Sequence, residues 1–288
     1  MIENKGNDKI FNIGIIILAS IYVIITIFPL LHVLASSFSS PSAVNAGKVG
    51  IIPKEFTLTS YIKVLQDKTI IRGLLNTILY TTLGTIIQLV LQFTAAYSLS
   101  RKDLKYKKFW NLFFVIPMFV SGGLIPTYLV VKQLGMLNTI WAIIIPGCVN
   151  LFNLIIIRTF IVSTIPWEMQ EAAMIDGASN WKIFIKIIIP LCKPVIAVMA
   201  LYAIVGFWNN YFNSLMYVTD DSLFPLQRVL QRFLIANDSG TIGGGEAEVL
   251  AQSLKYSTIV ISSLPILFIY PFFQRYFEKG MMIGSVKG

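Results

Sequence analysis

The residues of this chain that are best suited to bind a ligand form one short segment of aromatic and amide side chains. Residues 208–213 read WNNYFN and supply three aromatic rings and three amide groups. A neutral sugar needs this combination, because its C–H faces stack on rings and its hydroxyl groups pair with amides. We therefore expect these residues to line a sugar pathway. They are Trp208, Asn209, Asn210, Tyr211, Phe212 and Asn213.

The sequence offers little for catalysis or for metal binding. It has one histidine, His32, and two cysteines, Cys148 and Cys192. One histidine builds neither a metal site nor a Ser-His-Asp triad, and two thiols in apolar runs are no disulfide framework. The phosphate-binding motif G-x-x-x-x-G-K-[ST] is absent, so energy must come from a partner. We expect no catalytic residue, no metal site and no cofactor.

The composition is that of a membrane protein. Hydrophobic residues make up 56% of the chain, charged residues 13%, and the mean hydropathy is +0.73. A soluble domain has about 25% charged residues and could not cover this much apolar surface, so we expect membrane lipid around the chain. The net charge of +9 is typical of cytoplasmic loops rich in Lys and Arg, and we expect no nucleic-acid partner.

Six apolar segments are long enough to cross a bilayer as helices, which takes about 20 residues. They are 11–36, 72–100, 109–131, 138–162, 194–218 and 256–274. With the N-terminus inside, 14 of the 23 Lys and Arg residues fall on the cytoplasmic side. This bias predicts that both termini are cytoplasmic, and we interpret the basic loop 101–108 as a topology signal.

Polar residues within spans are candidates for function. Residues 208–213 lie in the fifth span, where the alternative interpretation is hydrogen bonding between helices and an aromatic belt. Four more amides lie in other spans, and for these we favour packing over a pathway. They are Gln88, Gln92, Asn150 and Asn153.

One long polar segment interrupts the apolar chain between the fourth and fifth spans. The segment 163–193 is longer than a connection between two spans needs to be. Long ordered loops are usually functional. Pro166 and Glu168 suit the start of a helix, Gly177 suits its end, and Ser179 can cap a second helix. The sequence therefore predicts two short helices joined at a glycine.

The two predicted helices have different faces. In the first, Met169, Ala172, Ala173 and Asp176 share one face, and the alanines there make a flat patch that another backbone can approach. The second carries an apolar stripe and is expected to lie along the membrane surface until Pro190 stops it. The residues of the stripe are Trp181, Phe184, Ile185 and Ile188.

The stretch EAAMIDGASNWKIFIKIIIP resembles the EAA loop of permeases from ATP-binding-cassette (ABC) importers. The positions that match in type and spacing are Glu171, Ala172, Ala173, Gly177, Ile187 and Pro190. Ile189 departs from the pattern, because the family usually has Leu there. The resemblance implies a coupling helix that docks into a cytoplasmic ATPase, with Glu168 and Asp176 as further contacts.

The resemblance extends over nearly the whole chain. Residues 72–101, GFWNNYFNSLMY and the ending YFEKGMMIGSVKG are similar to segments of the carbohydrate-importing branch, and FPLQRVLQRFLI to its lipoprotein- or aldouronate-type oligosaccharide permeases. In that branch the C-terminal tail reaches between the two ATPase subunits. The tail residues expected to make this contact are Met282, Gly284, Val286, Lys287 and Gly288.

The resemblance implies an all-α polytopic membrane protein with six transmembrane helices and the type I ABC importer permease fold. The implied partners are a homologous sister permease in a heterodimer, two copies of a cytoplasmic ABC ATPase, an extracytoplasmic solute-binding protein and an oligosaccharide. The implied location is the bacterial cell membrane.

The expected division of the chain follows from the spans and loops. It comprises a cytoplasmic N-terminus at 1–10, the first helix at 11–36, an extracytoplasmic loop at 37–70, an importer core at 71–275 that contains the coupling loop 163–193, and a cytoplasmic tail at 276–288.

Three alternatives remain open. The chain could be an ABC permease for another small solute such as an amino acid or osmolyte, although its Trp-Asn segment and tail argue against this. It could be a secondary transporter, although its spans contain no Asp or Glu for ion coupling. It could also be a membrane scaffold that only recruits an ATPase.

Overall fold

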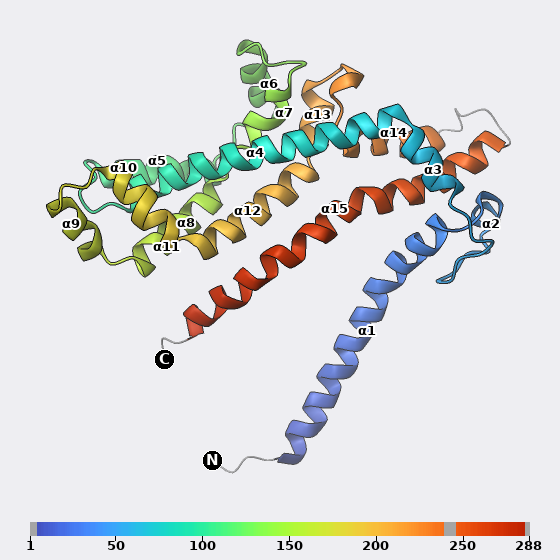
Figure 1. Cartoon of the computed structure of the whole chain (residues 1–288), viewed down its shortest axis with the longest axis horizontal. Helices are drawn as coiled ribbons and strands as arrows, with labels where there is room; N and C mark the ends of the chain where they lie inside the picture. The colour runs from blue at the N-terminus through green and yellow to red at the C-terminus, as the bar shows by residue number, and fades with distance from the viewer. Residues whose placement is uncertain (1–4, 239–245, 286–288) are drawn as a thin grey trace. The chain divides into compact units, whose positions relative to one another are not determined.

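The computed structural model describes residues 5–238 and 246–285, and every regular element among them is a helix. In chain order these are α1 Lys5–Ser37, α2 Pro41–Asn45, α3 Thr59–Gln66, α4 Lys68–Ser100, α5 Lys107–Phe119, α6 Leu124–Gln133, α7 Ile140–Ile144, η1 Ile145–Gly147, α8 Leu151–Thr164, α9 Trp167–Ile175, α10 Asn180–Ile183, η2 Phe184–Ile188, α11 Ile189–Leu191, α12 Lys193–Trp208, α13 Phe212–Tyr217, η3 Asp221–Leu223, α14 Leu226–Asp238 and α15 Glu246–Ser285. Figure 1 shows their course.

The described residues contain three continuous helices that are long and apolar enough to cross a membrane. They are Phe11–Ser37, Lys68–Ser100 and Leu254–Phe272. Three further candidates are pairs of helices bent at a short break, so the total reaches six if each pair is one span. The pairs and their bends are Lys107–Phe119 with Leu124–Gln133 at 117°, Ile140–Gly147 with Leu151–Thr164 at 48°, and Asn180–Leu191 with Lys193–Trp208 at 82°.

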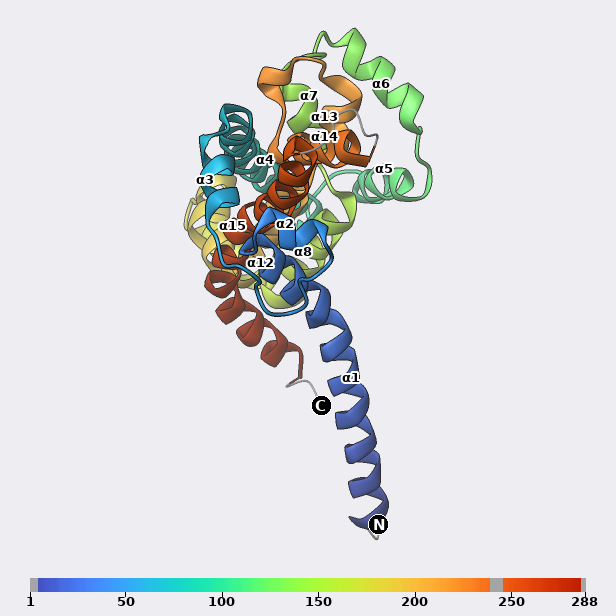
Figure 2. The same cartoon turned by 90° about the vertical axis from the view of Figure 1, so that its right-hand side faces the viewer.

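The predicted spans at 109–131 and 138–162 each contain a break, and the predicted span at 194–218 is interrupted between α12 and α13. α5 ends two residues after Pro117, and Gly123 adopts φ +84° before α6 begins. At Ile145 the second segment becomes a short 3-10 helix around Pro146. Proline removes a backbone donor, and glycine reaches conformations that end helices. The sharp turn between α5 and α6 is visible in Figure 2.

The chain divides into two compact units, the first of which comprises Met1–Ile70 and Leu230–Leu264. In this unit a small apolar cluster joins the end of α1 to the α2 loop, with Tyr256 packed against it. His32 donates from Nδ1 to the carbonyl of Gly50 at 3.0 Å and meets the Tyr256 ring edge-on. The only histidine of the chain is thus held in a packing contact.

The second unit comprises Ile71–Val229 and Pro265–Gly288, and its core lies between α4, α8 and the helices from α10 to α12. One face of α8 enters this core through Leu154, Ile157 and Ile161, which recur at helical spacing. Phe93 and Tyr97 enter it from α4. α13 contacts both α6 and α7 (Figures 1 and 2).

The N-terminal part of α4 is fastened to the segment that follows α13. Asn76 donates from Nδ2 to the carbonyls of Ser222 and Phe224 at 2.9 and 3.0 Å. Tyr80 donates to the Leu223 carbonyl at 3.0 Å, and the hydroxyl of Thr77 accepts the N–H of Leu226 at 2.8 Å. These bonds satisfy backbone groups of an irregular segment, so they hold it in one conformation against α4.

Candidate functional site

The aromatic and amide segment lies at a helix break and not within a span. α12 ends at Trp208, Asn209 is its C-cap, and α13 begins at Phe212. Trp208 is buried, whereas Tyr211 and Phe212 are exposed. The six residues therefore do not form a single face, and each has a different surrounding.

Two of the amides donate hydrogen bonds to the same backbone carbonyl. Asn213 and Asn210 donate from Nδ2 to the carbonyl of Ile143 at 3.1 and 3.4 Å. Ile143 lies just before the 3-10 turn, in which Pro146 has no N–H to donate to this carbonyl. The amides replace the missing donor, and they thereby connect the α12–α13 break to α7.

A cavity of about 490 Å³ opens beside this break. Its lining carries four amide side chains and three aromatic rings, without a charged side chain. The amides are Gln88, Asn150, Asn153 and Asn210, and the rings are Phe152, Tyr202 and Phe207. Amides donate and accept hydrogen bonds and rings offer flat apolar faces, so the cavity can bind a neutral polyhydroxylated surface.

Two contacts position the walls of this cavity. Gln92, which is fully buried on α4, donates from Nε2 to the carbonyl of Asn150 at 3.0 Å. Asn150 is the N-cap of α8, and its Oδ1 accepts the N–H of Asn153 at 3.1 Å. Because the cap fixes where α8 begins, it also fixes where Asn153 meets the cavity. Gln92 orients this wall without lining it.

The polar segment after α8 has the predicted form of two short helices joined at a glycine. Gly177 adopts φ +74°, its N–H bonds the Met174 carbonyl at 3.0 Å, and the N–H of Ala178 bonds the Ala173 carbonyl at 2.9 Å. This pair of bonds is a Schellman motif, in which glycine takes the left-handed position. Ser179 then caps α10 by accepting the N–H of Lys182 at 3.3 Å.

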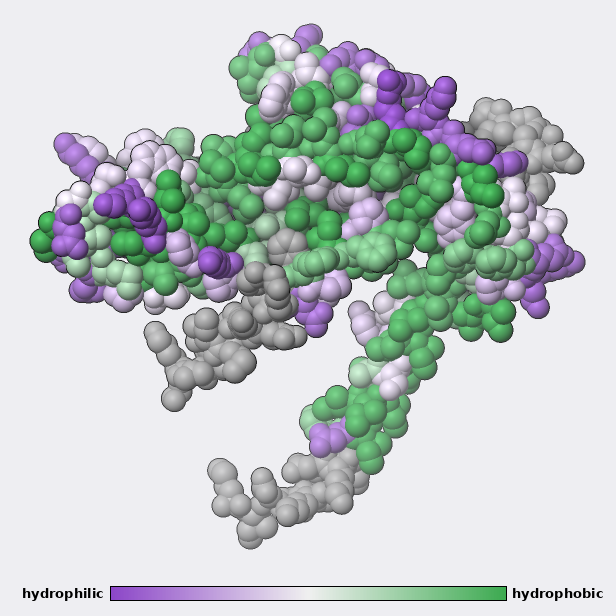
Figure 3. Space-filling model, in the orientation of Figure 1, coloured by the Kyte–Doolittle hydropathy of each residue, from purple (hydrophilic) through white to green (hydrophobic). Residues whose placement is uncertain are grey.

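α9 presents most of its surface outward. Glu168, Glu171, Ala172 and Asp176 are exposed, and the side chain of Ile175 is 83% exposed. Gln170 is buried, and Ala173 packs against the core of the second unit. On the face drawn in Figure 3, hydrophilic side chains gather over the end that carries α9 and α10, beside a hydrophobic band along α4. The exposed surface of α9 thus combines carboxylates with an apolar side chain.

The chain matches one known protein family over most of its length. Residues 93–283 match the model of the family described as the binding-protein-dependent transport system inner membrane component. The chain belongs to this family. It is a permease of an ABC importer and a multi-pass protein of the cell membrane, and it has the fold of such permeases.

Individual relatives match over the full length of the permease. Protein LplC of Bacillus subtilis is 41% identical over 99% of this chain and 98% of its own length. The polygalacturonan/rhamnogalacturonan transport system permease protein YtcP of the same organism is 36% identical over 98% and 99%. The permease also resembles a chain of a bacterial ABC transporter that imports the acidic polysaccharide alginate, with a TM-score of 0.86, 29% identity and coverage of 94% and 98%.

Only some of the predicted pathway residues of the permease lie at the cavity. Asn210 lines the cavity, whereas Asn209 is exposed and donates to the Val205 carbonyl at 2.9 Å. Three amides for which we favoured packing over a pathway, Gln88, Asn150 and Asn153, also line the cavity. The break between α7 and α8 brings these residues from distant helices to one place.

The predicted coupling residues of the permease are mostly exposed, with two qualifications. Ala173 and Ile187 are partly buried against the core, so the flat patch does not extend over both alanines. In the second helix Phe184 and Ile188 are buried while Trp181 and Ile185 are exposed, so the apolar stripe divides between two surroundings. The helix also passes Pro190 and ends at Leu191, because a π-helical turn at Phe184–Ile188 accommodates the proline.

The tail lies partly outside the described residues of the permease. α15 continues to Ser285, so the backbone of Met282 and Gly284 is helical. Val286, Lys287 and Gly288 lie outside the residues that the structure describes. Within the described part of the chain, no group of three or more His, Cys, Asp or Glu residues could hold a metal ion.

Proposed function

We propose that this permease forms half of the membrane pathway for an oligosaccharide that an extracytoplasmic binding protein delivers. The observation that carries the proposal is the cavity of about 490 Å³, which combines four amides with three aromatic rings. A sugar presents hydroxyl groups around its edge and C–H groups on its faces, and these two side-chain types match the two surfaces.

The relatives support a sugar as the substrate. YtcP is named for polygalacturonan and rhamnogalacturonan, and the solved transporter is described as an importer of alginate. The cavity lining holds no charged side chain, so on this side of the pathway recognition rests on hydroxyl groups and ring faces. An acidic sugar would then find its cationic partners on the sister permease or on the binding protein.

ATP hydrolysis belongs to a partner in this proposal. The chain has no phosphate-binding motif, and α9 supplies the contact with a cytoplasmic ATPase. Its docking surface comprises Glu168, Glu171, Ala172, Ile175 and Asp176, all exposed. Ile175 was missed by sequence reasoning, although it lies four residues after Glu171 and so on the same side of the helix.

The assembly that we propose holds this permease, a homologous sister permease, two copies of the ATPase and the binding protein. In this proposal the chain crosses the membrane six times, so both termini lie on one side, and the distribution of Lys and Arg supports the cytoplasmic side. The division of the chain given by its spans, with the coupling loop at 163–193, is part of the same proposal.

The test is uptake by the reconstituted importer. Proteoliposomes that hold the complete complex and binding protein are given ATP and, separately, neutral oligosaccharides, uronate oligosaccharides, amino acids and osmolytes. We expect ATP-dependent uptake of one sugar class only. Uptake of an amino acid or osmolyte alone would overturn the sugar assignment, and uptake driven by an ion gradient without ATP would overturn the importer itself. If the complex recruits the ATPase but takes up none of these solutes, the chain is a membrane scaffold and not part of an importer.

The docking surface has its own test. The change Ile175→Asp should release the ATPase from the purified complex, because it places a charge in an apolar contact. The matched control is Lys102→Asp, which adds the same side chain at an exposed position of the neighbouring loop. If both variants retain the ATPase equally, α9 is not the docking helix.

A further inference from the structure

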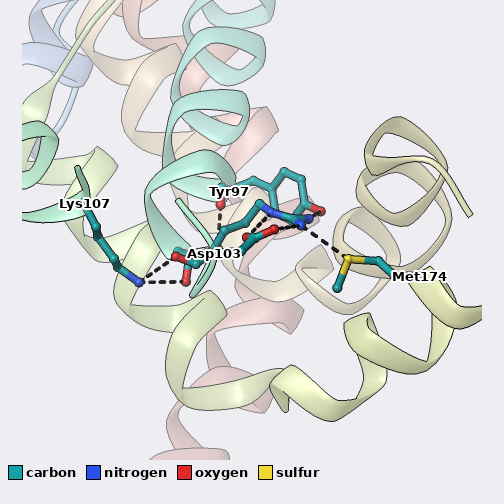
Figure 4. A network of polar contacts seen from close by, with 6 residues as sticks. Tyr97, Asp103, Lys107 and Met174 are labelled. Carbon is teal, nitrogen blue, oxygen red and sulfur yellow. Dashed lines mark hydrogen bonds and ion pairs between the residues drawn. The ribbon is translucent and has the colours of Figure 1, made fainter. Parts of the chain in front are cut away.

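A buried guanidinium lies where α4 meets the coupling loop. Arg101 directly follows the last residue of α4 and is 8% exposed. Its Nε and Nη2 donate to the two carboxylate oxygens of Asp103 at 2.8 and 2.6 Å, and its Nη1 donates to the Tyr97 hydroxyl at 2.9 Å. These contacts are drawn in Figure 4. They hold the guanidinium in one orientation.

The same guanidinium reaches both ends of α9. Nη2 donates to the sulfur of Met174, in the last turn of α9, at 3.4 Å. The Trp167 ring, which belongs to the first residue of α9, lies 5.5 Å from the guanidinium carbon in a cation–π arrangement. A helix held at its first and last turns cannot tilt freely about the point where it is attached. We call Tyr97, Arg101, Asp103, Trp167 and Met174 the Arg101 network.

α9 has few other attachments to the core. Gln170 is buried, and Ala173 and Met174 pack against the core of the second unit, but the rest of its length faces outward. After α9 the chain passes through Gly177, where a Cβ would meet nothing within 4 Å. The Arg101 network therefore carries much of the connection between α9 and α4.

The end of α4 to which Arg101 belongs is itself held by cations. Lys107 donates to the carbonyls of Arg101 and Ser100 at 2.7 and 3.3 Å, and Arg158 of α8 donates to the Leu99 carbonyl at 3.3 Å. Cations are favourable at the C-terminal end of a helix, where the last carbonyls lack partners. This end of α4 is thus fixed to α5 and α8, and a guanidinium attached to it moves with it.

Two residues of the basic loop therefore point inward, while the others do not. Lys102, Lys105 and Lys108 are exposed, as a topology signal requires, but Arg101 is buried and Lys107 is half-buried. The hydrogen bonds from Arg101 also lower the pKa of the Asp103 carboxyl, because they stabilise its ionised form. The pair consequently stays charged throughout the neutral range, and its two parallel bonds persist.

Only arginine can make this set of contacts. Its planar fork donates in several directions at once and stacks on an aromatic ring, whereas the ammonium of lysine is a single compact charge. A lysine at position 101 would keep the charge and lose the simultaneous contacts with Asp103, Tyr97 and Met174. The lysine and methionine variants thus separate the role of charge from that of geometry.

We propose that Arg101 is a positioning residue that transmits movement of the coupling helix α9 to the membrane helix α4. The proposal rests on the proposed function, in which α9 docks on the ATPase. When the ATPase moves α9, the guanidinium makes Trp167 and Met174 move together with Tyr97 at the end of α4. Without it, α9 follows the ATPase while α4 lags behind, and ATP is hydrolysed without transport.

The first test measures sugar transported per ATP hydrolysed in the reconstituted importer. Arg101→Met should lower this ratio about tenfold, and Arg101→Lys should lower it nearly as much, since several contacts are lost together. The matched control Lys102→Met removes an exposed neighbouring charge and should keep the wild-type ratio. A purely structural role would lower the yield of complex but leave the ratio of the purified complex unchanged, which would overturn the proposal.

A second measurement follows α9 directly. A spin label at position 169, in an importer whose permease has Cys148→Ala and Cys192→Ala, reports the mobility of α9 from an exposed position outside its docking surface. Arg101→Met should increase this mobility in the ATP-free complex, and Lys102→Met should not. Trp167→Leu should increase it as well, with little further increase in the double variant. Equal mobility in the wild type and in Arg101→Met would overturn the proposal.

The two tests separate this inference from the proposed function. If Ile175→Asp releases the ATPase while Arg101→Met keeps the wild-type ratio and the wild-type mobility, α9 is the docking helix but Arg101 does not transmit its movement. If Ile175→Asp retains the ATPase, the assignment of α9 has failed, and the mobility of the spin label still shows whether Arg101 holds the helix.

Discussion

The ring of Phe207 lies directly against Gly84, in the space that a side chain at position 84 would need. A Cβ on Gly84 would come within 2.7 Å of Cε1 and Cζ of this ring, and one on Gly147 would come within 3.4 Å of Cε1. Phe207 thus packs between α4 and the turn after α7, and it forms one wall of the cavity. The close approach of α12 to α4 depends on the absence of a side chain at position 84.

Gly84→Ala should therefore destabilise the permease and distort its cavity. The added methyl group must displace the Phe207 ring, and overpacking of this kind costs about 1–3 kcal/mol. We expect a lower midpoint of thermal unfolding for the purified complex, together with reduced sugar uptake.

The control for this prediction is Gly206→Ala, where a Cβ meets nothing within 4 Å and alanine favours the helix. It should leave the midpoint unchanged or raise it. A smaller side chain at the other partner, in the double variant Gly84→Ala/Phe207→Leu, should recover part of the lost stability. If Gly84→Ala unfolds at the wild-type temperature, the ring has another position available.

Replacing Gly177 should loosen α9 through backbone strain alone. Its φ of +74° suits glycine, and a Cβ at this position would meet no atom within 4 Å. Alanine should cost about 1 kcal/mol there, and asparagine less. We expect weaker retention of the ATPase for Gly177→Ala in a pull-down assay, and reduced uptake.

Gly135→Ala is the matched control, since Gly135 has φ +66° and equally open surroundings but lies far from α9 in the chain. It introduces the same strain and should leave ATPase retention intact. Loss of the ATPase in both variants would mean that strain anywhere in the permease disturbs the complex. The coupling loop would then have no special part in it.

Gln88→Leu and Asn153→Leu should each raise the KM for sugar uptake. Each replaces an amide of the cavity by an apolar group of similar size, and a lost hydrogen bond of about 0.5–1.5 kcal/mol corresponds to a few-fold to tenfold change. Asn209→Ala should leave KM unchanged, because Asn209 is exposed and is not among the residues that line the cavity. If Asn209→Ala raises the KM while Gln88→Leu and Asn153→Leu leave it unchanged, the sugar passes the α12–α13 break and not the cavity.

Deletion of residues 282–288 tests the proposed contact of the tail with the ATPase. The truncated permease should insert and pair with its sister, because the deleted residues follow the last apolar span, which ends at Phe272. We expect weaker ATPase retention or weaker stimulation of ATP hydrolysis by the loaded binding protein. Wild-type retention together with wild-type stimulation would mean that these residues make no functional contact.

Local signals in the sequence predicted the form of the segment 163–193, in which two short helices are joined at Gly177. The turn at Gly177 and the cap at Ser179 depend on residues at most four positions away, so their chemistry is readable along the chain. The cavity could not be predicted in this way, because Gln88, Asn153 and Phe207 come from three helices whose approach depends on bends and on glycine contacts. Arg101 appeared only as one of five cations, since nothing in its spacing shows that Trp167 and Met174 meet it.

The same limit explains why the sequence predicted a pathway at the aromatic and amide residues 208–213 and favoured packing for the amides of the other spans. A cluster in sequence is easy to see, but in the structure it separates into Trp208 inside the protein, Asn210 at the cavity and Asn209 outside it. The cavity lining is a cluster in space, to which the segment contributes Asn210 alone.

The length of α4 has a mechanical consequence. Its 33 residues span about 50 Å, well beyond the apolar thickness of a bilayer of about 30 Å. Asn76 and Tyr80 hold the segment after α13 near one end of this rod, and Arg101 holds α9 at the other. A tilt of about 5° about one end would displace the other by about 4 Å at this length. In the proposed orientation the segment after α13 faces outward, and a binding protein that pressed on it would act on α9 through a lever, with no relay of side chains across the membrane.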